Sequence, residues 1–357
     1  MPLPQNWQHN RVTEEINIYR QALSGTYLKG MKTQVINGQP SYKKPGLTQA
    51  LIVAAICIAY ILLSTALIGF KMDQVILCLI FIFCYFVAKL TRRFILGFSI
   101  FIIYWIIFDL MKAFPNYLFH SVHMEDLYNT EKSLFGIETN GVRLTPNEYW
   151  LQHTTTFLDV MTGFFYICWV PVPLLFATYL FFTRREQFLQ FALTFFLVNI
   201  IGFIIYYTFP AAPPWYIQQH GFQFIPKTPG NTAGLARFDH YFGIQMFKGL
   251  YEKSSNVFAA MPSLHSAFPL IVFYYGVKNK LGYINILFAC VAVGIWFSAL
   301  YTSHHFTLDV MAGISCAILA IALLQYLVRK NKTMIKFMHM MMRVTAPTPK
   351  NPLQEVL

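Results

Sequence analysis

Long apolar runs constrain this chain more than any other feature of its sequence. Of its 357 residues, 56% are hydrophobic and only 12% are charged, which excludes a disordered chain. About eight runs are long enough to cross a bilayer as helices of roughly 20 residues, although the second is short enough to be tilted or partly interfacial. We place them approximately at 47–70, 74–88, 94–111, 158–182, 188–209, 257–277, 282–301 and 306–328. The sequence therefore predicts an all-α integral membrane protein with about eight transmembrane helices.

The net charge of +12 follows membrane topology rather than the pattern of a nucleic-acid-binding protein. Lys and Arg gather before the first run, after the last, and in the connections 89–93, 184–185 and 278–280. All these segments fall on one side if every run spans, and the positive-inside rule makes that side cytoplasmic. The connections 112–157, 210–256 and 302–305 then face the periplasm, the lumen or the exterior. We therefore expect chemistry carried by these connections to lie on the non-cytoplasmic face.

The segment MPSLHSAFP (261–269) has the features of a helix start that binds phosphate. Pro262 suits the first turn of a helix, and Ser263 is a good capping residue. The first N–H groups of such a helix are unpaired and attract anions. His265 would then lie beside a bound phosphate, able to give or take a proton. The alternative is an ordinary helix start whose histidine caps a neighbouring carbonyl.

The segment HHFTLDVMAG (304–313) combines two histidines with an aspartate. Ionisable groups at a membrane edge are costly to desolvate, so they usually mark a site. His305 and Asp309 are four residues apart, which predicts one helix face and a carboxylate that orients the imidazole. An oriented imidazole can act as a nucleophile or a base. His304 would point about 100° away on the helix, so we expect it to have a structural role.

A zinc site built from His265, His304, His305 and Asp309 is an alternative. Adjacent histidines on one helix cannot easily face one ion, so we expect no metal and no other cofactor. A third segment, FPAAPPWY (209–216), has three closely spaced prolines that stop a helix and force extended backbone. Trp215 and Tyr216 would then lie at headgroup depth, either as substrate contacts or as part of an aromatic belt.

These residues carry a resemblance to a known superfamily. The order Ser298, His305, Asp309, preceded by P-S-x-H, resembles the type 2 phosphatidic acid phosphatase (PAP2) superfamily. The resemblance implies a PAP2-like helical core in which His305 attacks phosphorus, Asp309 orients it and His265 protonates the leaving oxygen. It also implies that Ser263 and Ser298 belong to the phosphate site. The usual arginine after the serine is absent here, so another cation must serve the phosphate.

Longer blocks resemble a subfamily, the inositol phosphorylceramide synthases of the aureobasidin A-sensitive type. The blocks are FPAAPPWY (209–216), AGLARFDHYFGIQMF (233–247), SNVFAAMPSLHSA (255–267) and YTSHHFTLDVMAG (301–313). The resemblance covers the second half of the chain strongly and Phe157–Asp159 weakly. It makes Arg237 the leading candidate for the missing phosphate cation. The alternative for Arg237 is a loop arginine paired with Asp239.

The resemblance implies a lipid phosphotransferase that moves phosphoinositol, or a similar headgroup, from a glycerophospholipid to a ceramide-like acceptor. Its partners would be membrane lipids and not nucleic acid, with an accessory subunit left open. A lipid phosphate phosphatase is an alternative, because nothing in the histidine–aspartate pattern separates transfer from hydrolysis. A lipid or headgroup transporter is disfavoured, because the motifs gather at one face and the sequence has no inverted repeat. The compact chain favours a bacterial inner membrane over a eukaryotic Golgi membrane.

The motifs also divide the chain into four parts. We expect a cytoplasmic extension at 1–46, N-terminal transmembrane helices with an outer loop at 47–157, a catalytic transmembrane core at 158–328 and a cytoplasmic tail at 329–357. The outer loop 112–157 is too long for a plain connector, and its segment SVHMEDLYNTEKSLFGI predicts an interfacial helix. The tail predicts another interfacial helix, and the extension a surface helix around 11–28.

Overall fold

The computed structural model describes residues 45–251 and 256–345. The chain divides into one unit of Met1–Ala54 with Ala346–Leu357 and a second unit of Ala55–Thr345. In the first unit the described residues are 45–54, which enter the first long helix. The second unit holds the rest of the fold and the candidate site. The surface helix expected around 11–28 lies outside the described residues.

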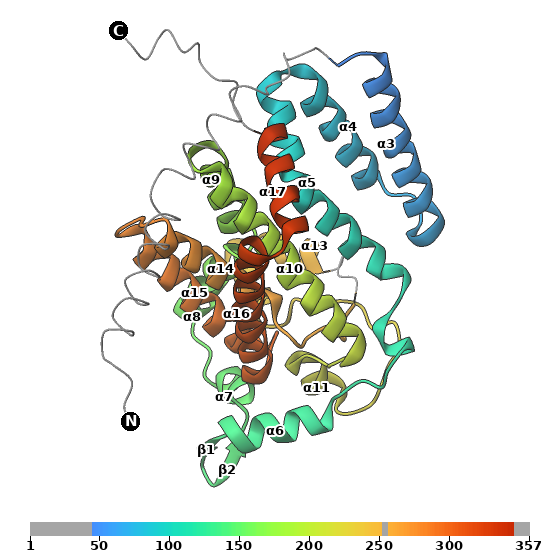
Figure 1. Ribbon diagram of the computed structural model, residues 1–357. Coiled ribbons are helices and arrows are strands. Elements are labelled where there is room, and N and C mark those ends of the chain that lie inside the picture. Colours follow the sequence, from blue (N-terminus) through green and yellow to red (C-terminus); the bar gives the residue numbers. More distant parts are fainter. Residues whose placement is uncertain (1–44, 252–255, 346–357) are drawn as a thin grey trace, which may run out of the picture. The chain divides into compact units, whose positions relative to one another are not determined.

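Long helices follow the apolar runs of the sequence (Figure 1). Six described segments are long and apolar enough to cross a membrane, which supports the predicted membrane class. The long helices and the helix that follows them are α3 (Leu47–Ile68), α4 (Met72–Val87), α5 (Lys89–Leu110), α8 (Thr156–Ile167), α9 (Pro171–Thr183), α10 (Arg185–Thr208), α14 (Leu264–Lys278), α15 (Ile284–Tyr301), α16 (Thr307–Lys330) and α17 (Lys332–Thr345).

The second expected span is short, as predicted, and the sixth is shorter than predicted, so the count of about eight is not confirmed. Helix α4 has 16 residues, and α14 has 15 and begins at Leu264 instead of near residue 257. The residues before α14 bond to another loop instead: Ala211 N–H donates to Phe258 O at 2.9 Å, and Ala260 N–H donates to Ala211 O at 3.3 Å. Backbone groups that pair with a neighbouring loop cannot also form helical bonds.

Short elements fill the two long connections. The first holds η1 (Met111–Ala113), η2 (Asn116–Leu118), α6 (Glu125–Phe135), β1 (Ile137–Thr139), β2 (Val142–Leu144) and α7 (Pro146–Gln152). The second holds α11 (Pro214–His220), η3 (Ala233–Leu235), α12 (Ala236–Phe242) and α13 (Met246–Tyr251). Helix α6 confirms the helix predicted in the first connection.

The antiparallel hairpin of β1 and β2 was not predicted. It pairs Ile137 with Leu144 and turns at Asn140 and Gly141, both of which have positive φ angles, 51° and 77°. Asn-Gly is the preferred pair for such a turn, because both residues tolerate the left-handed region. That dipeptide was the local signal that the sequence offered.

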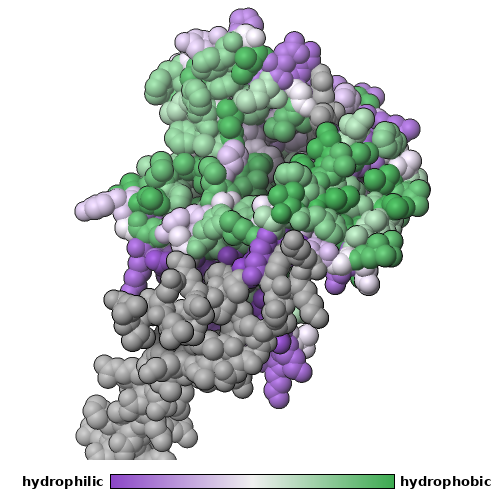
Figure 2. Space-filling model, turned by 90° about the horizontal axis from the view of Figure 1, so that it is seen from above, coloured by the Kyte–Doolittle hydropathy of each residue, from purple (hydrophilic) through white to green (hydrophobic). Residues whose placement is uncertain are grey.

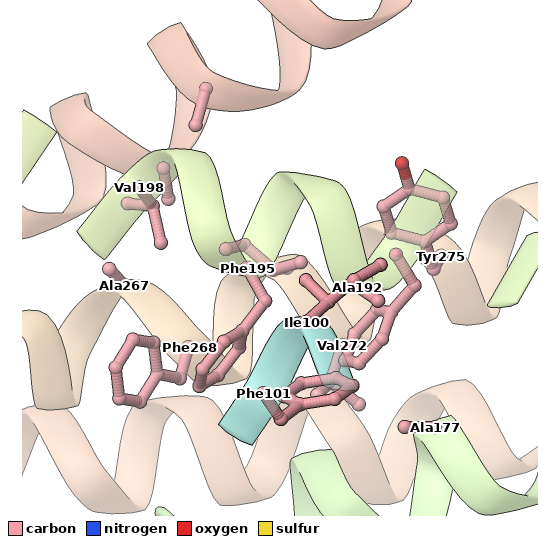
Figure 3. Packing of buried hydrophobic residues seen from close by; sticks show 14 of the residues in the cluster. Ile100, Phe101, Ala177, Ala192, Phe195, Val198, Ala267, Phe268, Val272 and Tyr275 are labelled. Atoms are coloured by element: carbon pink, nitrogen blue, oxygen red, sulfur yellow. The ribbon is translucent and has the colours of Figure 1, made fainter. Parts of the chain in front are cut away.

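Aromatic side chains of α5, α10 and α14 form the centre of the largest buried cluster (Figure 3). The rings of Phe195 and Phe268 lie 4.3 Å apart between centroids, and Phe101 lies 5.2 Å from Phe195. A buried hydrogen bond of 2.8 Å joins the hydroxyls of Thr194 and Tyr275 in the same region. Lipid is as apolar as this core, so close packing and buried hydrogen bonds hold membrane helices together.

The outward-facing side chains are also apolar. Large exposed hydrophobic residues occur on α4, α5, α15 and α16, among them Leu79, Ile103, Ile286 and Leu319. Figure 2 shows hydrophobic side chains covering much of the described surface that it presents. An apolar surface of this extent is typical of a protein that contacts lipid.

The tail begins with the predicted helix, α17, although its apolar side lies against protein. Helix α17 packs on α5, α10 and α16, and Met338 is buried in the main cluster. The residues after Thr345 lie outside those described.

A close approach of backbone to backbone joins the two motif segments. Gly313 of α16 lies against Ser263, where a Cβ atom would overlap the Ser263 carbonyl oxygen. Ser263 N–H also donates to Asp309 O at 2.9 Å. Only glycine permits so close an approach, and it brings the start of α14 onto the first turns of α16.

Candidate active site

The structure brings the two predicted histidines together from opposite ends of the motif pattern. His265 stands in the first turn of α14, and His305 stands just before α16. His265 Nδ1 lies 3.1 Å from His305 Nε2, a hydrogen-bond distance. The two residues are 40 positions apart in the chain, so only the tertiary fold makes them neighbours.

Asp309 faces His305, but not in the way that the sequence predicted. His305 lies outside the helix, because α16 starts at Thr307 with Phe306 as its N-cap, so the one-helix-face prediction was wrong for this residue. The carboxylate still reaches the ring, with Asp309 Oδ2 at 3.6 Å from His305 Nδ1. Asp309 is fully buried, and its Oδ2 also accepts from Phe306 N–H at 2.8 Å.

This arrangement favours one set of proton positions. Within the described residues, His305 Nδ1 and Asp309 Oδ1 have no hydrogen-bond partner. A carboxylate facing Nδ1 stabilises a proton on that nitrogen, which leaves the lone pair of His305 on Nε2. His265 Nδ1–H then donates to His305 Nε2. The lone pair of His305 therefore points at His265, with the aspartate behind the ring.

Aromatic residues that the sequence did not single out surround His265. The Tyr166 hydroxyl lies 3.4 Å from His265 Nδ1, and Tyr251 OH donates to Tyr166 OH at 3.1 Å. Trp169 meets the His265 ring edge-on, with centroids 4.5 Å apart. Tyr166 and Trp169 follow the weakly resembling Phe157–Asp159 block closely, which was the only signal for them.

His304 has the structural role that the sequence predicted. Its Nε2–H donates to Thr232 O at 3.0 Å, and its ring stacks on Tyr251 with centroids 4.4 Å apart. Burial, together with the neighbouring His305, lowers the pKa of His304 to about 3, while the hydrogen bond to Thr232 acts in the opposite direction. His304 is therefore a neutral donor that ties the segment before α16 to the second outer connection.

Arg237 forms an ion pair, and its partner is Asp159, not the Asp239 of the alternative considered for it. Its Nε donates to Asp159 Oδ1 at 2.5 Å, and Tyr301 OH donates to the same oxygen at 2.8 Å. Asp239 instead accepts from the N–H groups of Phe247 and Lys248 at the start of α13. Asp159 was not a predicted site residue, although it ends the weakly resembling block.

One guanidinium nitrogen of Arg237 has no partner within the described chain. This nitrogen, Nη2, is buried, and a Cβ built at Gly234 would meet both it and Thr302. Thr302 stands three residues before His305. The guanidinium therefore lies beside the segment that leads to His305, with the N–H groups of this nitrogen unused.

Trp215 and Tyr216, predicted to lie at headgroup depth, are buried within the protein. Helix α11 begins at Pro214, so the extended backbone expected through the prolines ends there. Trp215 is 5% exposed and Tyr216 fully buried, in a cluster that also contains Phe306. Tyr216 OH donates to Gln223 O at 2.7 Å and accepts from Ile225 N–H at 2.8 Å. In this structure the two side chains organise the second outer connection.

The two predicted serines have internal partners. Ser263 is the N-cap residue of α14, and its hydroxyl oxygen accepts from Ser266 OH at 3.0 Å. Ser298 OH donates to Gly294 O, one turn back in α15, at 2.6 Å. Both serines are fully buried.

Residues from both outer connections hold the segment between α15 and α16. Gly234 N–H donates to Thr302 O at 2.9 Å, and Trp215 N–H donates to Ser303 O at 3.0 Å. The buried Asn147 donates its side-chain N–H to His305 O at 2.9 Å. Asn147 was not predicted as a functional residue, because its partner lies 158 positions away.

The sequence is also similar to known proteins. Residues 141–323 match the PAP2 superfamily. Phosphoinositol dihydroceramide synthase of Bacteroides thetaiotaomicron is 42% identical over 284 residues, which cover 79% of this chain and 93% of that protein. The catalytic subunit of inositol phosphorylceramide synthase of Saccharomyces cerevisiae is 36% identical over 132 residues, 36% of this chain and 31% of that protein. No solved structure matches the chain.

The apolar helices and the superfamily match define a membrane protein of the PAP2 class. The chain belongs to the PAP2 superfamily, as the resemblance of its motifs indicated.

A pH effect on stability follows from the burial of His304. An unfolded histidine titrates near its ordinary pKa of about 6.5. Between pH 6.5 and about pH 3, His304 binds a proton in the unfolded chain but not in the folded chain. The free energy of unfolding therefore falls as the pH falls through this range. The contribution approaches about 1.4 kcal/mol per pH unit.

His304→Gln keeps a donor near Thr232 but cannot titrate. Its melting temperature in detergent should fall less between pH 7 and pH 5 than that of the wild type. Equal falls would contradict the neutral, buried state of His304.

Proposed function

We propose that this chain is a phosphotransferase that moves phosphoinositol from a phosphatidylinositol-like glycerophospholipid to the primary hydroxyl of a ceramide-like lipid. The observation that carries the proposal is the 42% identity to a phosphoinositol dihydroceramide synthase along 93% of that protein's length. The pair of His265 and His305 supports it, because group transfer through an enzyme intermediate needs a nucleophile next to an acid.

In the first step His305 Nε2 attacks the donor phosphorus. The N–P bond forms while the bond from phosphorus to the diacylglycerol oxygen breaks. His265, in its protonated state, gives a proton to that oxygen, and diacylglycerol leaves. Asp309 stabilises the positive charge that develops on the His305 ring, because its carboxylate lies 3.6 Å from Nδ1. The donor phosphate has to enter between the two imidazoles, which are in contact here.

In the second step the acceptor hydroxyl attacks the phosphoinositol group on His305. His265, now neutral, takes the hydroxyl proton, the N–P bond breaks and a new O–P bond forms. Both histidines return to their starting states, so the cycle needs no external reagent. The aromatic side chains of Tyr166, Trp169 and Tyr251 around His265 favour transfer to a lipid, because they limit the access of water to the intermediate.

Arg237 is our candidate for the cation that serves the phosphate. Asp159, which also accepts from Tyr301 OH, binds one edge of the guanidinium, and the buried Nη2 remains free to donate within the described chain. A planar guanidinium can answer the charge of a phosphoryl transition state with parallel hydrogen bonds. The ion pair with Asp159 would then hold the guanidinium in place through Nε and leave Nη2 available for the substrate phosphate.

We further propose that the site faces the non-cytoplasmic side of the membrane. The basic connections support this orientation, because they lie at the opposite ends of the spans from the motifs. In a cysteine-free background, Gln219→Cys should react with an impermeant thiol reagent from outside intact cells, and Lys280→Cys should not. The side chains of Gln219 and Lys280 are exposed, so access depends on the membrane side alone. The reverse labelling would put the site in the cytoplasm.

The histidine mechanism predicts the effect of three substitutions. His265→Ala, His305→Ala and Asp309→Asn should each reduce transfer from labelled phosphatidylinositol to ceramide by at least about 10³-fold, as for removal of a member of a catalytic group. His304→Gln should stay within about tenfold of the wild type, because its side chain is a structural donor. The measurement is product mass from purified protein in detergent. Wild-type turnover by His305→Ala would exclude this mechanism. Release of inositol phosphate without ceramide product would favour the phosphatase alternative.

Arg237→Lys tests the proposed phosphate cation. A lysine keeps the charge but loses the fork of donors, so turnover should fall on the order of 10²-fold, as when a preorganised donor is removed. The loss should appear in kcat more than in the KM for the donor lipid, if the contact tightens in the transition state. Arg343→Lys, an exposed change in α17, is the matched control and should be neutral. Kinetics near wild type for Arg237→Lys would assign the phosphate to another cation.

A further inference from the structure

Glu131, in the outer helix α6, binds the start of the helix that carries Asp309. Its Oε1 accepts from Thr307 N–H at 2.8 Å, and its Oε2 accepts from Leu308 N–H at 3.1 Å. Glu131 has no exposed surface. The two partners are 176 and 177 positions away in the chain, so this is a long-range contact.

This contact completes the N-terminus of α16. The first N–H groups of a helix lack partners within it and attract negative charge. Asp309 takes the N–H of Phe306, which leaves those of Thr307 and Leu308 for Glu131. Burial raises the pKa of Glu131, while the hydrogen bonds from Thr307 and Leu308 act in the opposite direction. A carboxylate is buried at acceptable cost only where it is paired in this way.

The N-terminal end of α6 is held as well. His123, just before the helix, donates its N–H to Pro210 O at 2.8 Å and accepts from Ala212 N–H at 3.0 Å. Its ring stacks on Phe209 with centroids 3.8 Å apart and binds Asp126 of α6 at 2.5 Å. Helix α6 is therefore attached to the second outer connection at one end and to α16 at the other.

We propose that Glu131 is a positioning residue for phosphoryl transfer, and this inference rests on the proposed function. His305 stands two residues before Thr307, and Asp309 stands two residues after it. By fixing the intervening N–H groups, the Glu131 carboxylate sets the place of both residues relative to His265. Glu131 binds Thr307 and Leu308, so it acts through the geometry of the site and not on the substrate.

Glu131→Gln tests the proposal with almost no change in shape. Glutamine keeps one acceptor oxygen but turns an amide N–H₂ group towards the second backbone N–H, so one hydrogen bond and the charge are lost. We expect kcat to fall about 10- to 100-fold, because small displacements of reacting groups have effects of this size. The KM values for phosphatidylinositol and ceramide should stay within about threefold. Glu138→Gln, at an exposed position of β1, is the matched control and should be neutral.

Hydrogen exchange supplies a readout that does not depend on activity. The amides of Thr307 and Leu308 should exchange faster in Glu131→Gln than in Glu138→Gln, while peptides from α10 remain protected. Glu131→Asp, which keeps the charge on a shorter side chain, should regain part of the lost kcat and serves if glutamine prevents folding. Unchanged kcat, or unchanged exchange at Thr307 and Leu308, overturns the positioning role. An inactive wild type with the expected exchange difference would instead count against the proposed function alone.

Discussion

The anchoring of the short segment between α15 and α16 is the interaction on which the site depends. The N–H groups of His304 and His305 both donate to Ala299 O, at the end of α15. The carbonyls of Thr302, Ser303 and His305 accept from three different parts of the outer connections. Unpaired backbone groups in such a buried place would be costly, so each bond both satisfies a polar group and fixes a position. These hydrogen bonds hold the backbone of His305 in a position from which its ring faces His265.

This anchoring explains why the outer connections are long and folded. Short loops would suffice to join the helices, yet α6, α7, α11 and η3 all contribute partners to the segment or to the start of α16. Long ordered loops usually have such a function. Chemistry on a lipid headgroup needs reacting groups at fixed separations, and the helix core together with the outer elements packed against it supplies that rigidity.

Local patterns predicted the parts of the structure that local forces determine. The apolar runs predicted the long helices, the outer-loop pattern predicted α6, and the motif order indicated that His265, His305 and Asp309 belong to one site. The start of α14, the pairing of Arg237 and the place of His305 outside its helix were wrong or missed. Asp159, Asn147 and Glu131 were also missed as members of the site region. Asp159, Asn147 and Glu131 each make a hydrogen bond to a residue 78 or more positions away in the chain. Such long-range contacts leave no periodic pattern in the sequence.

The central claim is that His305 carries the phosphoinositol group between donor and acceptor. The most direct measurement incubates the purified protein with phosphatidylinositol in the absence of ceramide, quenches it and reads peptide masses. Our account predicts an inositol phosphate adduct on the peptide that contains His305, released diacylglycerol in equal amount, and loss of the adduct when ceramide is added. An adduct on His265, or ceramide product formed at full rate with no adduct detectable on either histidine, would contradict it.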